Sequence, residues 1–287
     1  MTKIKRYDLH KNDPSKLHFE VNHAKNYLDK NWEHATVPHR HSFYQLIWFK
    51  EKGRHYVDFE VVEHDANSVF FVNKNQIHYF CPDSPNTGLL FHFNEEFINL
   101  HGPKQLQRFS TTIFNEIGNR SVNLSPSEVQ KLGLISSYIE SEIIAREDNY
   151  KEQVFHHFQT ILYQVERLRA KEDKLDLDAN ADYKLAAQFK RLIQEQVGTF
   201  NSIESYADNL GTNPKTLTRI SKKFLLGTPG QIIKETKLLE AKRILSNQKT
   251  SIKETAYTLG FEDPTYFTKY FKQGTGITPK EFQKRLR

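Results

Sequence analysis

A pattern of about ten residues occurs twice in the last third of this 287-residue chain, and it constrains the fold more than any other feature. Ser202–Gly211 and Ser251–Gly260 share Ser, Ile, Ala, Leu and Gly at matching places, 49 residues apart. Each copy predicts a short helix that ends at a glycine. The Asn-Pro or Asp-Pro pair that follows predicts the cap and first turn of a second helix. Two short helices joined by a tight turn form a helix-turn-helix, so the sequence predicts two such units.

One helix, predicted over Gly230–Asn247, connects the two units. At ~1.5 Å per residue it spans ~27 Å, which can set two recognition helices about one turn of DNA apart on one face of the duplex. Charge supports this prediction. Residues 182–287 hold 19 Lys and Arg against 10 Asp and Glu, whereas residues 1–181 hold 22 against 25. The basic C-terminal third is therefore predicted to bind nucleic acid.

The region from about Asp182 to Arg287 resembles the DNA-binding domain of the AraC/XylS family of bacterial transcription activators. The residues that carry the resemblance are Ala256-x-x-x-Gly260-Phe261-x-Asp263-Pro264-x-Tyr266-Phe267-x-x-x-Phe271-Lys272-x-x-x-Gly276-x-x-Pro279-x-x-Phe282. The first unit follows the family pattern more loosely, and Lys237 stands where the family usually has Arg. The resemblance implies promoter DNA and RNA polymerase as partners, activation of transcription, and no enzymatic activity.

The resemblance also implies that outward-facing residues of both recognition helices read bases. These residues are Asn213, Lys215, Thr218, Arg219, Thr265, Tyr266, Thr268 and Lys269. Arg and Lys can donate to guanine O6 and N7, and Thr methyl groups suit thymine. A second set of side chains is expected to contact phosphates, which positions the protein without specifying sequence. These residues are Lys222, Lys223, Lys237 and Lys272. For Tyr266, a partly buried position in the core is an alternative to base reading. For every residue of both sets, the alternative to DNA contact is a side chain that is only solvated.

The front of the chain shows β patterns. Val57, Phe59 and Val61 alternate with polar residues, which predicts a strand through this segment. Further β-rich runs cover residues 68–72, 76–80 and 89–93, and turn residues separate them. Short strands at this spacing favour a sandwich or barrel.

Histidines cluster in this β-rich region. His39, His41, Gln45 and Gly53 resemble the first motif of the cupin fold, and His78 resembles the histidine of the second. His39, His41 and Gln45 share one strand face by parity. Metal cupins carry Glu where this chain has Gln45, which leaves three imidazoles, and three imidazoles can hold Zn²⁺ or Fe²⁺.

We expect these side chains to line a pocket for a small-molecule effector of unknown identity, without metal or cofactor. The expected lining is His39, His41, Gln45, Ile47, Val57, Phe59 and His78. Structural or surface histidines are the alternative interpretation.

Helical periodicity replaces the β pattern after Phe97. Ser125-Pro126 predicts a helix start. A second helix carries apolar residues at heptad spacing, and we refer to them as the seam: Val154, Phe158, Ile161, Val165 and Leu168. The seam has two interpretations, which are pairing with its own copy in a homodimer and packing on the barrel of its own chain.

These predictions define an α+β multidomain fold. Residues 1–171 are expected to form a cupin-like, ligand-sensing β-barrel with dimerisation helices, and residues 172–181 a charged linker. Residues 182–287 are expected to form an all-α DNA-binding domain with two helix-turn-helix units. The leading interpretation is a sequence-specific transcription regulator that responds to a small molecule. The alternatives are a metal-dependent cupin enzyme and a regulator without a small-molecule effector.

Composition excludes several other classes. Mean hydropathy is −0.69 and apolar runs are short, so no membrane span is expected. The basic start of the chain lacks an apolar stretch after it, so no secretory signal is expected, and the expected location is the cytoplasm. A single cysteine, Cys81, excludes a disulfide scaffold, an iron–sulfur cluster and a zinc finger, and it is expected to be a packing residue.

Overall fold

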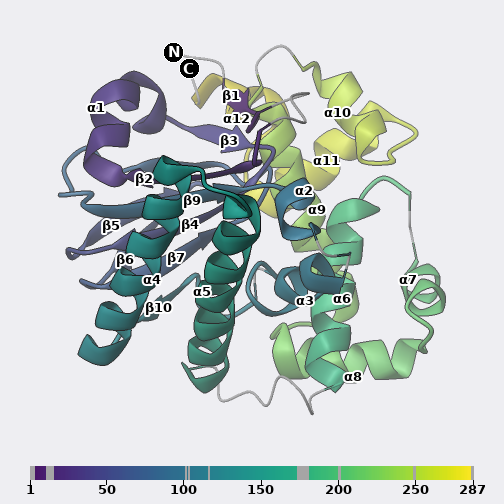
Figure 1. The fold of residues 1–287 in the computed structure, drawn as a ribbon. Helices are drawn as coiled ribbons and strands as arrows, with labels where there is room; N and C mark the ends of the chain where they lie inside the picture. The colour runs from purple at the N-terminus through teal and green to yellow at the C-terminus, as the bar shows by residue number, and fades with distance from the viewer. Residues whose placement is uncertain are drawn as a thin grey trace. The chain divides into compact units, whose positions relative to one another are not determined.

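The computed structural model, drawn as a ribbon in Figure 1, describes residues 4–10, 16–100, 102, 104–115, 117–172, 181–199, 202–247 and 250–285. The chain divides into two compact units. One is Arg6–Asp176, and the other is Leu177–Arg287 together with Met1–Lys5. Residues 173–180 of the predicted linker lie outside the described residues. Among the described helices, none is long and apolar enough to cross a membrane.

Two five-stranded sheets build the first unit, in the orders β1-β3-β8-β5-β6 and β10-β7-β4-β9-β2. The strands are β1 (Lys5–Tyr7), β2 (Phe19–His23), β3 (His39–His41), β4 (Tyr44–Phe49), β5 (Gly53–Val57), β6 (Glu60–His64), β7 (Ser68–Val72), β8 (His78–Phe80), β9 (Gly88–Phe93) and β10 (Ser121–Asn123). The central strand β4 pairs antiparallel with both β7 and β9. The β-rich N-terminal half predicted from the sequence is confirmed.

Strand β4 is buried on both faces, which explains its continuous run of apolar residues. Ile47 and Phe49 belong to the interior core between the sheets. Leu46 and Trp48 belong to a second core on the other face, shared with the helices. Gln45 has the parity of the interior residues, so a polar side chain enters an otherwise apolar layer.

Five helices are described in this unit: α1 (Ala24–Ala35), α2 (Glu95–Ile98), α3 (Lys104–Thr112), α4 (Pro126–Ala145) and α5 (Tyr150–Glu172). Helix α4 begins where the sequence predicts, and the Ser125 N–H donates to Glu128 Oε2 at 2.6 Å. Helices α4 and α5 run side by side in Figure 1 and cover the outer face of the second sheet.

The seam of α5 lies in the core of its own chain. Val154, Ile161 and Val165 are buried there. The ring of Phe158 contacts Phe19, with centroids 4.8 Å apart. Of the two interpretations, packing on the own barrel is confirmed. Pairing of this seam with a second copy is wrong, because four of its five side chains are buried and the fifth, Leu168, packs against the same core.

The strand predicted through Val57, Phe59 and Val61 is also wrong. Strands β5 and β6 form a hairpin instead, with Val57 opposite Glu60. Asp58 and Phe59 make the turn at φ of 50° and 73°, as a two-residue hairpin loop requires. The Asp58 carboxylate accepts a hydrogen bond from Gln76 Nε2 at 2.8 Å, which anchors the turn. Alternation alone did not reveal this turn.

The second unit is helical, as predicted. Its described helices are α6 (Ala181–Glu195), α7 (Ile203–Asn209), α8 (Pro214–Phe224), α9 (Pro229–Leu245), α10 (Ile252–Thr258), α11 (Pro264–Thr275) and α12 (Pro279–Arg285). Helices α7 and α8 form the first helix-turn-helix, and α10 and α11 form the second. Both turns contain a glycine at positive φ, Gly211 at 62° and Gly260 at 78°.

Helix α9 belongs to the cores of both helix-turn-helix units. Ile232, near its start, packs in the first core, which also contains Leu217 of α8. Leu238 and Leu245, further along, pack in the second core, which also contains Phe267 of α11. One continuous helix therefore fixes the two recognition helices, α8 and α11, relative to each other.

Candidate functional site

The first recognition helix, α8, exposes the residues that the sequence selects for base reading. Lys215 and Arg219 are exposed and Thr218 is half-buried. The hydroxyl of Thr218 donates to Pro214 O at 2.8 Å, which uses its hydrogen and leaves the methyl group for apolar contact. Asn213 caps the helix, and its Oδ1 accepts a backbone N–H at 2.9 Å.

The second recognition helix, α11, repeats this arrangement. Thr265 and Lys269 are exposed, and Thr268 is half-buried. The Thr268 hydroxyl donates to Pro264 O at 2.9 Å, as Thr218 does one unit earlier. Tyr266 is 67% exposed, so its side chain lies outside the core. The two helices thus offer matching sets of polar side chains to solvent.

Three of the four lysines selected for phosphate contact are exposed, namely Lys222, Lys223 and Lys272. Lys237 differs, because its side chain is only 9% exposed. Its Nζ lies 5.2 Å from the centroid of the Phe261 ring, and burial lowers its pKa. This buried position does not match a phosphate contact, because the ammonium group stacks on an aromatic ring of its own unit.

Four histidines meet inside the barrel of the first unit. His39 and His41 lie on β3, His78 on β8 and His55 on β5. His78 Nε2 lies 3.1 Å from His41 Nδ1, and His78 Nδ1 lies 3.1 Å from His55 Nε2. His39 Nδ1 donates to the carbonyl oxygen of Val37 at 2.9 Å. A connected set of imidazoles thus spans the first sheet.

Burial keeps these imidazoles neutral. Desolvation lowers the pKa of His39 to about 4 and the pKa of His55 to about 3. It also lowers the pKa of His41 and of His78 well below the ordinary value, and the neighbouring histidines add to the effect. All four side chains are therefore uncharged near neutral pH.

A second polar chain crosses the other sheet. Gln45 Nε2 donates to His92 Nε2 at 2.7 Å. An amide nitrogen can only donate, so the proton of a neutral His92 resides on Nδ1, which faces Glu20 Oε2 at 3.8 Å. His92 lowers the pKa of Glu20 through this contact. Burial and the Glu20 charge raise the pKa of the neighbouring Tyr27 to about 12.

A pocket of about 210 Å³ opens beside these two groups. Its lining includes Tyr7, Glu20, Tyr27, His39, Phe43 and His92. The lining combines aromatic faces with hydroxyl, carboxylate and imidazole groups. Such a pocket can hold a small polar molecule and orient it by hydrogen bonds.

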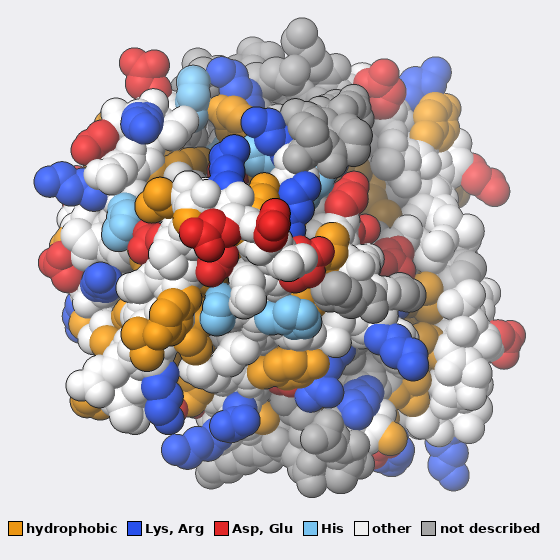
Figure 2. Space-filling model, in the orientation of Figure 1, with side chains coloured by type: hydrophobic (Ala, Val, Ile, Leu, Met, Phe, Trp, Pro, Cys, Tyr) orange, Lys and Arg blue, Asp and Glu red, His pale blue; other side chains and the backbone are white. Residues whose placement is uncertain are grey.

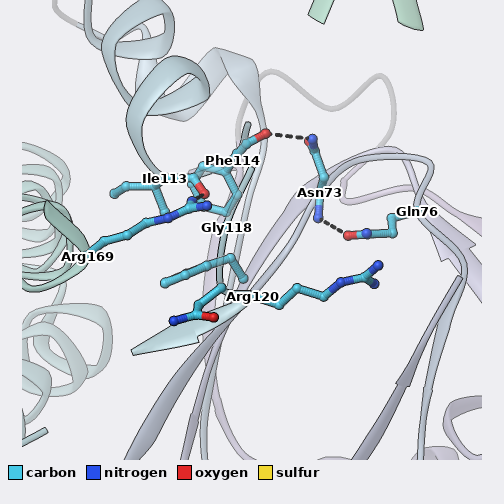
Figure 3. A pocket seen from close by; sticks show the side chains of 9 residues that line it. Asn73, Gln76, Ile113, Phe114, Gly118, Arg120 and Arg169 are labelled. Carbon is cyan, nitrogen blue, oxygen red and sulfur yellow. Dashed lines mark hydrogen bonds between the residues drawn. The ribbon is translucent and has the colours of Figure 1, made fainter. Parts of the chain in front are cut away.

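A second pocket lies between β7 and the loop that follows α3 (Figure 3). Arg169 enters it from α5 and donates to the Ile113 carbonyl oxygen. Asn73 Nδ2 donates to the Phe114 carbonyl oxygen at 2.8 Å. Its volume of about 20 Å³ has room for roughly one water molecule, so it is too small for an effector.

The residues predicted to line the pocket lie in three different places, which are the pocket, the interior and the surface. His39 lines the 210 Å³ pocket, while His41 and His78 are buried beside it. Ile47 and Val57 lie in the interior apolar core. Phe59 is 37% exposed on the hairpin turn, so its predicted inward orientation is wrong.

Sequence reasoning did not select the other pocket residues. His92 lies in the β-rich run predicted over residues 89–93, but only the pairing of β9 with β4 sets it opposite Gln45. Tyr27 and Glu20 have no signal in the sequence, because they lie on α1 and β2 in a segment without a clear pattern. Cys81 is buried and free, in the position of a packing residue.

Together, a barrel with a polar pocket and two capped helix-turn-helix units define the architecture of a ligand-responsive DNA-binding protein. Comparison with known protein families supports this two-part architecture. Residues 27–173 match the model of the AraC-like ligand binding domain, and residues 206–285 match that of a helix-turn-helix domain. The chain therefore belongs to the AraC family.

Individual relatives share only parts of the chain. The uncharacterized HTH-type transcriptional regulator YisR of Bacillus subtilis is 32% identical over 124 residues, which are 43% of each chain. The HTH-type transcriptional activator RhaS of Escherichia fergusonii is 26% identical over 113 residues, 39% of this chain and 40% of RhaS. The chain thus matches less than half the length of either relative. Apo ToxT from Vibrio cholerae aligns over 94% of this chain and 98% of its own, with 16% identity and a TM-score of 0.42.

Proposed function

We propose that this protein is a sequence-specific DNA-binding regulator of transcription, an activator whose barrel unit binds a small-molecule effector. The observation that supports the proposal is that both recognition helices, α8 and α11, pack in cores that contain residues of α9. Helices α8 and α11 each begin at a side-chain cap. Each then carries a half-buried Thr followed by an exposed basic residue, Thr218-Arg219 and Thr268-Lys269. Helix α9 holds both, as binding to two successive major grooves requires.

We assign functions to the same residue ranges that the sequence predicts as domains. We assign effector binding and dimerisation to residues 1–171, the linker to 172–181 and DNA binding to 182–287. Bases are read by the exposed residues of α8 and α11, and phosphates are contacted by Lys222, Lys223 and Lys272. RNA polymerase is the partner that an activator requires. The function needs no catalytic step, and the cytoplasm is where these partners are found.

The effector site is the 210 Å³ pocket. Its size favours a small molecule, and its carboxylate, hydroxyl and imidazole groups favour a ligand with several hydrogen-bonding groups. A metabolite library screened by thermal shift tests this assignment. Ligands that raise the melting temperature of the wild type should have no effect on Tyr27→Phe or His92→Phe. If no ligand of the pocket changes DNA affinity, the alternative of a regulator without an effector replaces this part of the proposal.

A homodimer requires a surface other than the seam. Helix α4 exposes Leu134, Tyr138 and Ile144. Tyr138 also stacks on His157 of α5, with ring centroids 5.5 Å apart. Figure 2 shows apolar side chains on the face over α4, beside histidines. We assign the two-fold contact to this face, because a symmetric dimer needs an exposed apolar patch that can meet its own copy.

The decisive experiment is selection of DNA sites from a randomised duplex library by the purified full chain. The proposal expects one enriched motif with two halves about one helical turn apart. Failure to enrich any motif, with binding equal on all sequences, would overturn specific DNA recognition.

A further inference from the structure

Three histidines converge at one point in the barrel, and we call them the triad: His39, His41 and His78. All three are buried, and each offers a ring nitrogen within 4.8 Å of those of the other two. The strand pairing produces this convergence. His39 lies directly opposite His78 in the β3–β8 ladder, and His41 follows two residues later on the same face.

The hydrogen bonds around the triad leave lone pairs directed inward. His39 Nδ1 donates to Val37 O at 2.9 Å, so the lone pair of a neutral His39 lies on Nε2. If His78 donates from Nδ1 to His55 Nε2, its Nε2 is also unprotonated. Metal-binding histidines typically donate their second ring N–H in this way, to a carbonyl or another acceptor.

The spacing fits a small ion. Zn–N bonds of ~2.0–2.1 Å place two tetrahedral ligand atoms ~3.3–3.4 Å apart. His78 Nε2 and His41 Nδ1 are separated by 3.1 Å, close to this edge length. His39 supplies the third ligand atom, and the ligand atoms of the three histidines all lie within 4.8 Å of one another.

Three neutral imidazoles select the class of ion. Imidazole suits Zn²⁺, Cu²⁺, Ni²⁺ and Fe²⁺, whereas Ca²⁺ and Mg²⁺ take oxygen ligands. Gln45 Nε2 donates to His92 on the other sheet, and among the described residues the group of side chains that converge is the three histidines alone. Three protein ligands leave a tetrahedral ion one position for water or a small molecule.

We propose that the barrel binds one divalent transition-metal ion of the Zn²⁺ type through His39, His41 and His78. The ion replaces the hydrogen between His78 Nε2 and His41 Nδ1 as the link between β8 and β3. Since His39 also lines the 210 Å³ pocket, the ion lies at the boundary of the proposed effector site. A bound ion differs from the metal-free barrel that the sequence predicts. It adds to the proposed function, and DNA recognition does not depend on it.

The competing account is a chain of neutral imidazoles linked only by hydrogen bonds. In this chain of imidazoles, either His78 Nε2 or His41 Nδ1 carries a proton, and the protonated nitrogen has no lone pair for a metal ion. In both accounts His55 Nδ1 is buried without a hydrogen-bond partner among the described residues. The two accounts differ in whether the folded chain takes up metal.

The test uses the full chain, stripped with a chelator and dialysed against metal-free buffer. Zn²⁺ binding is measured by equilibrium dialysis, and Co²⁺ is added as a visible probe. We expect one ion per chain and Co²⁺ d–d bands of a low-coordinate nitrogen site. His41→Gln and His78→Gln should abolish stoichiometric binding. His55→Phe, which removes the acceptor behind His78, should weaken it by roughly 10–100-fold.

His64→Gln is the matched control, because His64 is a buried histidine of the same barrel outside the triad. Its Zn²⁺ affinity should equal that of the wild type. Circular dichroism checks that each variant is folded. X-ray absorption on the wild type counts the imidazole ligands directly, so an unfolded variant does not leave the question open. Absence of stoichiometric binding by the folded wild type, or fewer than three imidazole ligands, overturns the proposal. DNA binding by the same preparation tests the proposed function separately.

Discussion

Arg219 of the first recognition helix forms a two-point ion pair with Asp182 at the start of α6. Arg219 Nη2 donates to Asp182 Oδ1 at 2.7 Å, and Nη1 donates to Oδ2. The hydrogen bonds and charge of Arg219 lower the pKa of Asp182. The guanidinium that we assign to base reading is therefore held by a carboxylate of its own unit, and DNA binding must exchange one partner for the other.

Asp182→Asn should strengthen DNA binding. Exposed ion pairs are weak, so release of Arg219 should raise affinity for a selected site by only about 1.5–5-fold. Fluorescence anisotropy with the selected duplex measures the change. Asp208→Asn is the control, because it removes an exposed carboxylate of α7 and leaves Arg219 paired. Equal gains in both variants would mean that only net charge matters.

Base reading and phosphate contact should separate in a pair of variants on α8. Arg219→Ala should cost roughly 1–3 kcal/mol on the preferred site and relax specificity at one base pair. Lys223→Ala should weaken all sequences alike and lower the salt slope by about one unit. Binding to a set of single-base variants at two salt concentrations measures both effects. Lys269→Ala should act as Arg219→Ala does, but in the other half of the site.

The assignment of α8 fails if Arg219→Ala and Lys223→Ala give the same uniform loss. If Arg219→Ala and Lys269→Ala alter the same half of the site, then α8 and α11 do not occupy two successive grooves.

Gly260→Ala should destabilise the second helix-turn-helix more than Gly276→Ala. Both glycines have positive φ, 78° and 79°, which costs an alanine ~1–2 kcal/mol. A Cβ on Gly260 would also lie 2.3 Å from the backbone oxygen of Gly198, whereas Gly276 has open space. Urea unfolding should therefore show a further loss for Gly260→Ala. Equal losses would mean that the backbone shifts to relieve the contact.

The seam of α5 and the exposed face of α4 should respond differently to substitution. Phe158→Ala should lower the free energy of unfolding by roughly 3–5 kcal/mol, because the ring is buried in the core. Tyr138→Glu should leave the unfolding free energy within about 1 kcal/mol and shift the protein to monomer, because that side chain is exposed. Denaturant unfolding and sedimentation measure the two effects. A Tyr138→Glu protein that remains dimeric contradicts the assignment of the dimer to α4.

Alkaline pH should remove the contribution of Tyr270 to stability. Burial raises the pKa of its hydroxyl from 10.0 to about 12, and the hydroxyl donates to Lys234 O at 3.0 Å. A raised pKa in the folded state stabilises the fold below pH 10, and this contribution declines as pH rises from 10 toward 12. The difference in unfolding free energy between wild type and Tyr270→Phe should therefore be constant below pH 10 and decline above it. A difference that does not change with pH would contradict this prediction.

The two helix-turn-helix units and the helix between them could be predicted from the sequence. The sequence signals for these helices lie next to the helices themselves. Each of four residues caps a helix that begins at the next residue, namely Ser202, Asn213, Ser251 and Asp263. Caps, Pro at the first helical position and turn glycines act within a few residues, so a pattern can record them. The exposed positions of α8 and α11 follow from the same helical period.

The barrel depended on contacts that are distant in sequence. The apolar spacing of α5 was compatible with a dimer or with the barrel of its own chain, and only the position of Phe158 against Phe19 decided between them. The hairpin at Asp58 was hidden because the apolar residues on either side continue the same alternation.

By itself, the sequence determined the two helix-turn-helix units, their exposed basic side chains and the presence of a β-rich unit with clustered histidines. Only the tertiary structure decided that Asp182 holds Arg219, that Lys237 is buried and that His92 joins Gln45 and Glu20 at the pocket. The physical reason is that caps and periodicity act over one or two turns of chain. An ion pair or a buried polar contact instead depends on which distant elements the core brings together.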